Sequence, residues 1–355
     1  MYKNFYVVGD SLSDNGAFVG SLNSILNVIK EEFHFLKWVD KIYFAPPFYQ
    51  SRSFSNGPMA VEYVADKLGT TMKPGWSFNI TPALKHWILE KKSIELGRPF
   101  DDLIKQGGIK ATNYDFSEQI GTNYAVSNAR ASKGDAVPDF LLFNYFQLKN
   151  QVRTLVRHHP DISTEDLLFV MIGGNDIMAA LFNKNPTALV DESITEICNA
   201  IEFLATNSSL QYIVIANVPD IGLIPRFVNT DLQKLATNLS QDFNQKLVEA
   251  IKDFNRKFPK IKIKLFDIES IFKSLISDYV KKGYNTEQAC VTDIADHQNF
   301  IDLLELLLKG RLDAAYNCGC NEEKILQYLF FDFFHPTKLP HQTVGDRLYN
   351  FIVSR

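Results

Sequence analysis

Short, mainly apolar runs alternate with helical stretches along much of this chain. The runs are rich in Val, Ile, Leu and aromatic residues, and they cover residues 2–8, 121–126, 166–172, 211–218 and 261–266. A strand that is apolar at every position is typical of a parallel sheet covered by helices on both faces, since neither face meets water. Strands that alternate with helices form βαβ units. The pattern therefore predicts an α/β protein, a three-layer α/β/α sandwich around a mainly parallel five-stranded sheet.

The stretches between these runs predict the helices. Their apolar spacing places helices over about 56–68, 139–158, 187–206 and 230–256, with a last one from about Pro340. The first of these starts at Asn56-Gly57-Pro58, where Asn caps a helix well and Pro suits the first turn.

A chain of 355 residues can form one α/β domain with long insertions, because such domains often exceed the usual domain length. We expect one domain over residues 1–355, with insertions at about 17–55, 70–118 and 285–325. Residues 17–50 show no clean period but are crowded with aromatic side chains. This segment forms either a wall over a functional site or a packed surface insertion, and the sequence leaves both open.

Composition narrows the range of partners. The 37 basic and 41 acidic residues give a formal net charge of -4, so no basic surface is expected for nucleic acid. No run approaches the roughly 18 apolar residues that would span a bilayer. The first expected strand follows Met1 directly, so a signal peptide either never existed or has been removed. The 28 Phe and 14 Tyr residues suit a site for long acyl chains as well as a core.

Three of the four cysteines lie late in the chain. These are Cys290, Cys318 and Cys320, whereas Cys198 falls in a helical stretch and is expected to be a buried thiol. The Cys-Gly-Cys sequence has no second pair and no His at finger-like spacing, so we expect no metal site. A disulfide from Cys290 to Cys318 or Cys320, closing a long loop, is the favoured use.

Polar residues follow the first three expected strands. They are Ser11, the pair Ser127-Asn128, and Asn175 in Gly173-Gly174-Asn175-Asp176. In open α/β sheets ligands bind at the carboxyl ends of strands, so these groups are candidates for one site. Two of them have a structural alternative. Ser11 could merely cap the following helix, and Gly-Gly-Asn-Asp is a sequence that commonly forms a turn.

A fourth polar pair, Asp332 and His335, lies near the end of the chain. Its spacing of three residues allows the two side chains to share one face of a turn. A serine hydroxyl becomes a good nucleophile when an imidazole oriented by a carboxylate takes its proton. The Ser11 N–H, an N–H of the turn after residue 126 and the Asn175 amide are candidate donors to an oxyanion.

Six sequence blocks together resemble the GDSL, or SGNH, family of lipases and esterases. In chain order they are 9–14 (GDSLSD), 53–58 (SFSNGP), 123–126 (NYAV), 173–176 (GGND), 218–222 (VPDIG) and 332–337 (DFFHPT). The resemblance covers nearly the whole chain and implies the SGNH hydrolase fold with a flavodoxin-like sheet. It implies Ser11 as nucleophile, His335 as base, Asp332 as the orienting acid and Asn175 as an oxyanion donor. It also implies hydrolysis of carboxylic esters without a cofactor.

Two blocks depart from the family pattern. The run at 123–126 is usually followed by Gly-Gly, whose N–H completes the oxyanion hole, but here Ser127-Asn128 follows. A backbone donor survives any side chain except proline, and Asn tolerates left-handed geometry, so we expect Asn128 to donate. Near Arg52, the block reads Ser51-Arg52-Ser53-Phe54 with an extra Ser, which leaves that loop's geometry open but not its chemistry.

The bacterial branch most similar to this chain contains lysophospholipases, phospholipases A and glycerophospholipid:cholesterol acyltransferases. We therefore expect a lipolytic acyl hydrolase, with acyl transfer as a further activity. A short-chain or carbohydrate esterase is the second hypothesis, and a catalytically inactive lipid-binding protein on the same fold is the third. Intact Ser11, Asp332 and His335 argue against the inactive form.

Partners and location follow from the same resemblance. The expected partners are a lipid or other ester and, transiently, a membrane or micelle surface, with no nucleic acid. Family members of this branch are commonly secreted and often carry a late disulfide loop, so a secreted or periplasmic location is expected. The leucine-rich stretch 300–312 inside that loop is predicted to cover the acyl groove or to contact a lipid surface. Alternatively, the loop only staples the C-terminal block and the leucines are core.

Overall fold

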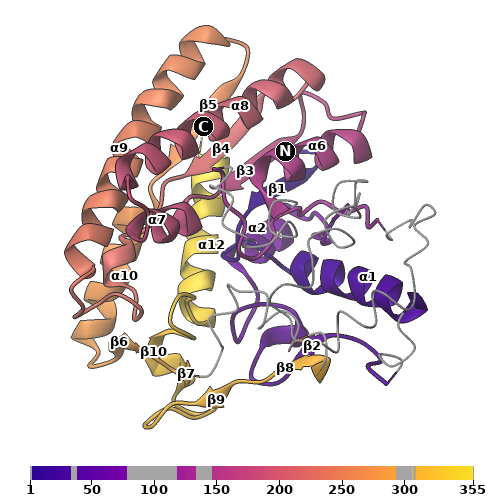
Figure 1. Ribbon diagram of the computed structural model, residues 1–355. Helices are drawn as coiled ribbons and strands as arrows, with labels where there is room; N and C mark the ends of the chain where they lie inside the picture. The colour runs from indigo at the N-terminus through magenta and orange to yellow at the C-terminus, as the bar shows by residue number, and fades with distance from the viewer. Residues whose placement is uncertain are drawn as a thin grey trace.

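The centre of the computed structural model is a parallel sheet (Figure 1). The structure describes residues 2–32, 38–77, 118–132, 146–292, 306 and 309–354. Four strands pair in the order β1-β3-β4-β5. They are β1 (Phe5–Gly9), β3 (Leu167–Met171), β4 (Tyr212–Ala216) and β5 (Lys262–Phe266). Because β1 and β3 are buried at every position, their continuous apolar runs are accounted for.

The remaining expected strand, residues 121–126, lies beside β1 but pairs with it through a single parallel bridge between Val7 and Asn123. The Val7 N–H donates to Thr122 O at 2.9 Å, and the Tyr124 N–H donates to Val7 O at 2.8 Å. At the end of β1 the Gln151 side chain accepts from the Gly9 N–H and donates to Gly9 O, each at 2.8 Å, so a side chain provides the hydrogen bonds that a neighbouring strand would make. Five segments thus lie in the flavodoxin-like order, which confirms the predicted α/β fold with a mainly parallel sheet.

Two groups of helices form the layers of the sandwich. In one, α8 (Pro186–Asn207) packs between α6 (Leu148–His158) and α9 (Gln233–Lys257). In the other, α12 (Lys338–Val353) packs on α2 (Ala60–Leu68) and contacts α10 (Ile268–Lys281). The bounds of α2, α8, α9 and α12 agree with the expected helices to within a few residues at each end. The expected helix 139–158 is matched only from Leu148 on, because Gln147 is not helical; residues 139–145 lie outside the described part of the chain. The helix α10 was not predicted.

Residues 17–50 contain a helix that the sequence analysis did not predict, α1 (Ala17–Glu32). The Asp14 carboxylate begins it, since Oδ1 accepts from the N–H groups of Gly16 and Ala17 at 2.8 and 2.7 Å. Its period was obscured by polar residues that make tertiary contacts. Asn23 is one of these, because its amide pairs with both backbone groups of Ile42.

The remaining described elements are short, apart from α7 and β6. They are β2 (Tyr43–Phe44), η2 (Tyr49–Ser51), α7 (Gly174–Leu181), η3 (Ile221–Leu223), β6 (Asn285–Ala289), β7 (Val291–Thr292), β8 (Arg311–Leu312), β9 (Ala315–Tyr316), η4 (Ile325–Gln327) and β10 (Tyr328–Phe330). Segments far apart in sequence meet here, because β2 pairs with β8 and β6 pairs with β10. The expected insertion at 285–325 therefore pairs with the first insertion, through β8 and β2, and with the segment just after it, through β6 and β10. Most of the expected insertion at 70–118 lies outside the described residues.

A disulfide joins Cys290 to Cys320, which decides between the two expected pairings. Cys318 is an exposed free thiol. Cys198, on α8, is also free but only half-buried, so the expectation of a buried thiol was wrong. The predicted covering role of residues 300–312 falls mainly outside the described residues.

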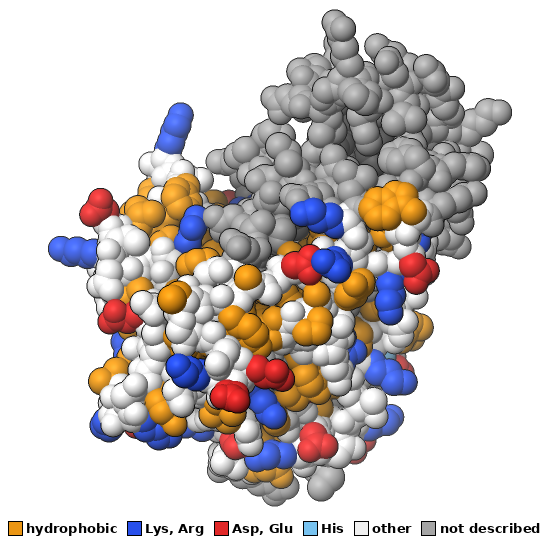
Figure 2. Space-filling view, turned by 90° about the horizontal axis from the view of Figure 1, so that it is seen from below, with side chains coloured by type: hydrophobic (Ala, Val, Ile, Leu, Met, Phe, Trp, Pro, Cys, Tyr) orange, Lys and Arg blue, Asp and Glu red, His pale blue; other side chains and the backbone are white. Residues whose placement is uncertain are grey.

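Within the described ranges, no helix combines the length and hydropathy needed to cross a membrane. Figure 2 shows one face of the molecule, on which apolar side chains lie interspersed with Lys, Arg, Asp and Glu.

Candidate active site

Three residues from the two ends of the chain form a hydrogen-bonded series. His335 Nε2 lies 2.7 Å from Ser11 Oγ. On the other side of the ring, His335 Nδ1 lies 2.7 Å from Asp332 Oδ2 and 2.9 Å from Oδ1. The contact at Nδ1 holds the hydrogen on that nitrogen, so Nε2 is free to accept the hydroxyl proton. The structure therefore brings Ser11, His335 and Asp332 together as the sequence predicted.

The turn between Asp332 and His335 is built around the Asp332 carboxylate. Its Oδ1 accepts from the N–H groups of Phe334 and His335 at 2.8 and 2.7 Å. The carboxylate is 1% exposed. A buried carboxylate that accepts from several N–H groups is held in one position, so it can orient the imidazole.

Aromatic residues from the first insertion lie against this turn. The Phe54 ring stacks on the His335 ring with centroids 5.0 Å apart, and Phe48 meets Phe331 at 5.2 Å. Phe44 packs on both Phe48 and Phe54. These buried rings form a wall beside the imidazole, which favours the first of the two interpretations of residues 17–50.

Three donors in this part of the molecule have a hydrogen to offer. Among the described residues, neither the Ser11 N–H nor the Asn128 N–H has a hydrogen-bond partner. The Asn175 Nδ2 donates one hydrogen to Ala129 O at 2.8 Å and retains a second. Asn128 has φ 66°, a left-handed conformation. The sequence analysis expected Asn to adopt this conformation in place of the family's Gly.

Two buried carboxylates hold the loop that carries Asn128. Asp14 Oδ2 accepts from both the N–H and the Oγ of Ser127 at 2.8 Å each. Asp176 accepts from the N–H groups of Ala131 and Ser132 at 3.0 and 2.8 Å. The loop is therefore fixed on both sides of Asn128.

Sequence reasoning did not assign a role to Asp14 or Asp176. Each lies inside a block that was recognised for a neighbouring residue, since Asp14 follows Ser11 by three positions and Asp176 follows Asn175 directly. The sequence feature that could have identified them is an acidic residue at the end of a block recognised for its neighbours. Such a carboxylate is buried only when several donors surround it.

Asp10 is a further buried carboxyl next to Ser11. Its Oδ1 accepts from the Leu12 N–H at 3.1 Å, and the side chain is 4% exposed. Burial raises the pKa of Asp10 to about 7, against the opposing effects of that N–H and of His335. Asp10 is thus a buried carboxyl with a raised pKa directly before Ser11 in the chain.

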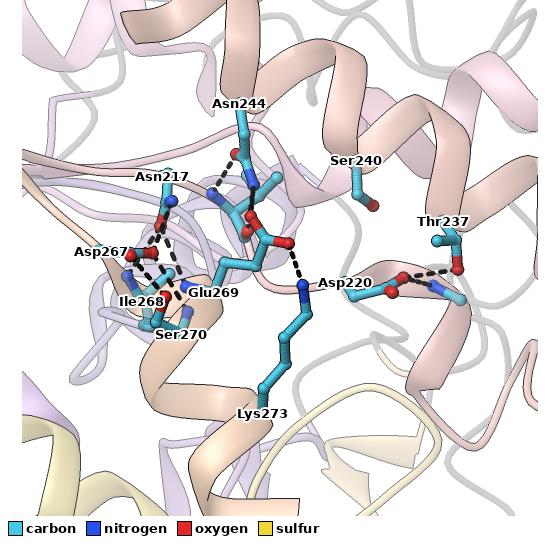
Figure 3. A network of polar contacts seen from close by, with 12 residues as sticks. Asn217, Asp220, Thr237, Ser240, Asn244, Asp267, Ile268, Glu269, Ser270 and Lys273 are labelled. Atoms are coloured by element: carbon cyan, nitrogen blue, oxygen red, sulfur yellow. Dashed lines mark hydrogen bonds and ion pairs between the residues drawn. The ribbon is translucent and has the colours of Figure 1, made fainter.

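A polar network fixes the loops that follow β4 and β5 (Figure 3). Asn217 Oδ1 accepts from the Ile268 N–H at 2.7 Å and its Nδ2 donates to Asp267, which joins the two strand ends. Asn244 of α9 pairs with both backbone groups of Val218 at 2.9 Å. The loop after β4 is thus held on α9 and on the start of α10.

The described residues contain no group of three or more His, Cys, Asp or Glu side chains that could hold a metal ion. The hydrogen-bonded series and the three donors are of the residue types that acyl transfer by an oxygen nucleophile requires.

Comparison with known proteins identifies a family and two relatives. The family described as GDSL-like Lipase/Acylhydrolase matches residues 5–348. The secreted effector protein SseJ of Salmonella typhimurium is 24% identical over 205 residues, which cover 58% of this chain and 44% of that protein. Lipase 1 of Photorhabdus luminescens is 30% identical over 136 residues, which cover 38% of this chain and 19% of that protein. The matched parts thus span less than half the length of either relative.

Proposed function

The chain belongs to the GDSL-like lipase/acylhydrolase family, and we propose that it hydrolyses acyl esters of lipids with Ser11 as the nucleophile. The observation that carries the proposal is the unbroken series from Ser11 Oγ through the His335 ring to the Asp332 carboxylate. Each of its contacts is short enough for proton transfer or for orienting the ring.

The first half of the reaction forms an acyl-enzyme. Ser11 Oγ attacks the ester carbonyl carbon while His335 Nε2 takes the hydroxyl proton, and the carbonyl π electrons move onto oxygen. The Ser11 N–H, the Asn128 N–H and the Asn175 amide donate hydrogen bonds to that oxyanion. Collapse of the intermediate breaks the bond to the alcohol, which leaves with the proton from His335.

The second half releases the acid. Water loses a proton to His335 as it attacks the acyl carbon, and the second tetrahedral intermediate collapses onto Ser11 with return of the proton to its oxygen. Where an alcohol replaces water, the same step transfers the acyl group. Acyl transfer therefore needs no further residue, only an acceptor that reaches the acyl-enzyme.

The proposed substrates are lysophospholipids and diacyl phospholipids. The aromatic wall beside His335 and the relative named Lipase 1 support a lipid ester over a carbohydrate ester. The disulfide and the relative named as a secreted effector support a secreted or periplasmic location, with transient contact to micelles or membranes. A short-chain esterase remains the alternative for the same residues.

The test is a substrate panel of lysophosphatidylcholine micelles, phosphatidylcholine vesicles, p-nitrophenyl acetate and acetylated xylan. We expect release of fatty acid from lysophosphatidylcholine, and we expect Ser11→Ala to lower the rate of that release by a factor of about 10^4 to 10^6. Activity on p-nitrophenyl acetate or xylan alone would replace the lipid substrate with the short-chain or carbohydrate alternative. No Ser11-dependent turnover of any ester would leave the inactive lipid-binding form.

A further inference from the structure

An apolar cavity of about 60 Å³ lies next to the hydrogen-bonded series. Three of its lining residues adjoin the series in sequence: Leu12 follows Ser11, and Phe334 and Pro336 flank His335. Protein interiors hold few voids larger than a water molecule, so a cavity of this size at the carboxyl edge of a parallel sheet is a candidate ligand site.

The lining follows the carboxyl ends of the strands from β1 to β5. It begins at Leu12 after β1, continues through Met171 at the end of β3 and Pro219 after β4, and reaches α10, which follows β5. On α10 the lining residues are Ile268, Phe272 and Leu275, which share one face of the helix by their spacing. The cavity therefore leads from the side of Ser11 toward a wall made by α10.

That wall is well supported. Phe272 meets Phe330 of β10 with ring centroids 5.7 Å apart in an edge-on arrangement, and both rings are buried. The loop after β4 is held by Asn244 and by the bond between Thr237 and Asp220 at 2.8 Å. The Phe272 ring is therefore held in one position on the α10 side of the cavity.

The lining suits a hydrocarbon chain better than water. Its one ionisable side chain is His341, and the other lining side chains are all apolar. His341 Nδ1 accepts from the Ala60 N–H at 3.3 Å, while its Nε2 has no hydrogen-bond partner among the described residues. A buried water needs two to four polar partners, and one imidazole does not supply them.

We propose that this cavity receives the end of the substrate acyl chain nearest the ester carbonyl, and that Phe272 sets the chain length at which it is full. The inference rests on the proposed acyl hydrolysis and adds to it the place of the chain and the residue that limits it. Val344 lines the same cavity from α12, so a larger side chain there should shorten the accepted chain.

The expected magnitude follows from burial of methylene groups. Each methylene that enters the cavity should raise kcat/KM about fourfold, which corresponds to about 0.8 kcal/mol. The rise should stop when the cavity is full. Phe272→Leu should move the plateau to longer chains, and Val344→Phe should move it to shorter ones.

The experiment measures kcat/KM for p-nitrophenyl esters of even chain length from acetate to palmitate, below their critical micelle concentrations. Phe254→Leu is the matched control, because Phe254 is a buried ring on α9 that does not line the cavity. Opposite shifts in the two cavity variants, with an unshifted control, are the expected result. Ser11-dependent hydrolysis with the same chain-length profile in all three variants would overturn the inference and leave the proposed function standing.

A binding measurement covers the case in which no ester is hydrolysed. Calorimetric titration of the Ser11→Ala protein with octanoate should give an affinity that Val344→Phe weakens by about tenfold or more and Phe254→Leu leaves unchanged. That result with no turnover would support the cavity and remove the proposed function. Octanoate binding that is absent, or equal in the two variants, would overturn the cavity assignment whatever the activity shows.

Discussion

The buried imidazole of His341 should make the fold sensitive to acid. Burial lowers the pKa of His341 to about 3, with a smaller contribution in the same direction from His335. In the unfolded chain a histidine has a pKa of about 6.5, so below that pH the unfolded state binds a proton that the folded state does not. Stability is therefore lost as the pH falls from about 6.5 toward the folded pKa.

The size of this loss at pH 5 depends little on the folded pKa. The unfolded imidazole is then about 1.5 pH units below its pKa, and at 1.36 kcal/mol per unit the folded state loses about 2 kcal/mol relative to high pH. Any folded pKa below about 4 gives nearly the same figure, because the folded imidazole is neutral at pH 5 in every such case.

His341→Gln tests this directly, since the Gln amide does not titrate and its oxygen can accept from the Ala60 N–H that Nδ1 now pairs with. Urea unfolding at pH 7 and pH 5 should show the unsubstituted protein losing about 2 kcal/mol more than the variant over that interval. Comparing the change in unfolding free energy between pH 7 and pH 5 in the two proteins cancels the contributions of the other titrating groups. It also cancels any pH-independent effect of the substitution on stability. Equal losses in the two proteins would refute the buried, neutral assignment of His341.

Two further predictions follow from contacts around the site. Ser127→Ala removes the hydroxyl that bonds Asp14 and should lower kcat about tenfold with little change in KM. Ser132→Ala, in the same loop, removes a hydroxyl that has no partner among the described residues and should leave both constants unchanged; equal effects of the two changes would refute the positioning of Asn128. Opening the disulfide by Cys290→Ser should lower the free energy of unfolding by about 3 to 4 kcal/mol, because the bond closes a loop with a sequence separation of 30. Cys318→Ser, which removes a free thiol, is the matched control and should have no effect. Unfolding in guanidinium measures both.

The sheet was predictable because each of its strands is a local signal. Runs such as 167–172 are apolar at every position, and burial on both faces of a parallel sheet favours that pattern. The helix Ala17–Glu32 was missed because its polar residues serve distant partners, as Asn23 does with Ile42, and no local period reports such a contact.

The candidate site divides in the same way. Ser11 and His335 stand in blocks whose residue types suit acyl transfer, so they could be named before any geometry was known. Asp14 and Asp176 act on a loop more than forty positions away in sequence, at separations of 113 and 45 residues, and only the folded chain reveals their donors. The cavity beside the series depends on side chains from many segments, which no single stretch encodes.

The most direct test of the central claim is covalent labelling of the serine. A fluorophosphonate probe reacts with a serine hydroxyl whose proton is taken by a neighbouring base, so it reports the series from Ser11 to Asp332 without requiring the correct substrate. Intact-mass and peptide analysis should find one label, on Ser11, which is lost in Ser11→Ala and slowed by about 10^3 or more in His335→Gln. A label on another serine, or equal labelling of the His335→Gln protein, would contradict the account.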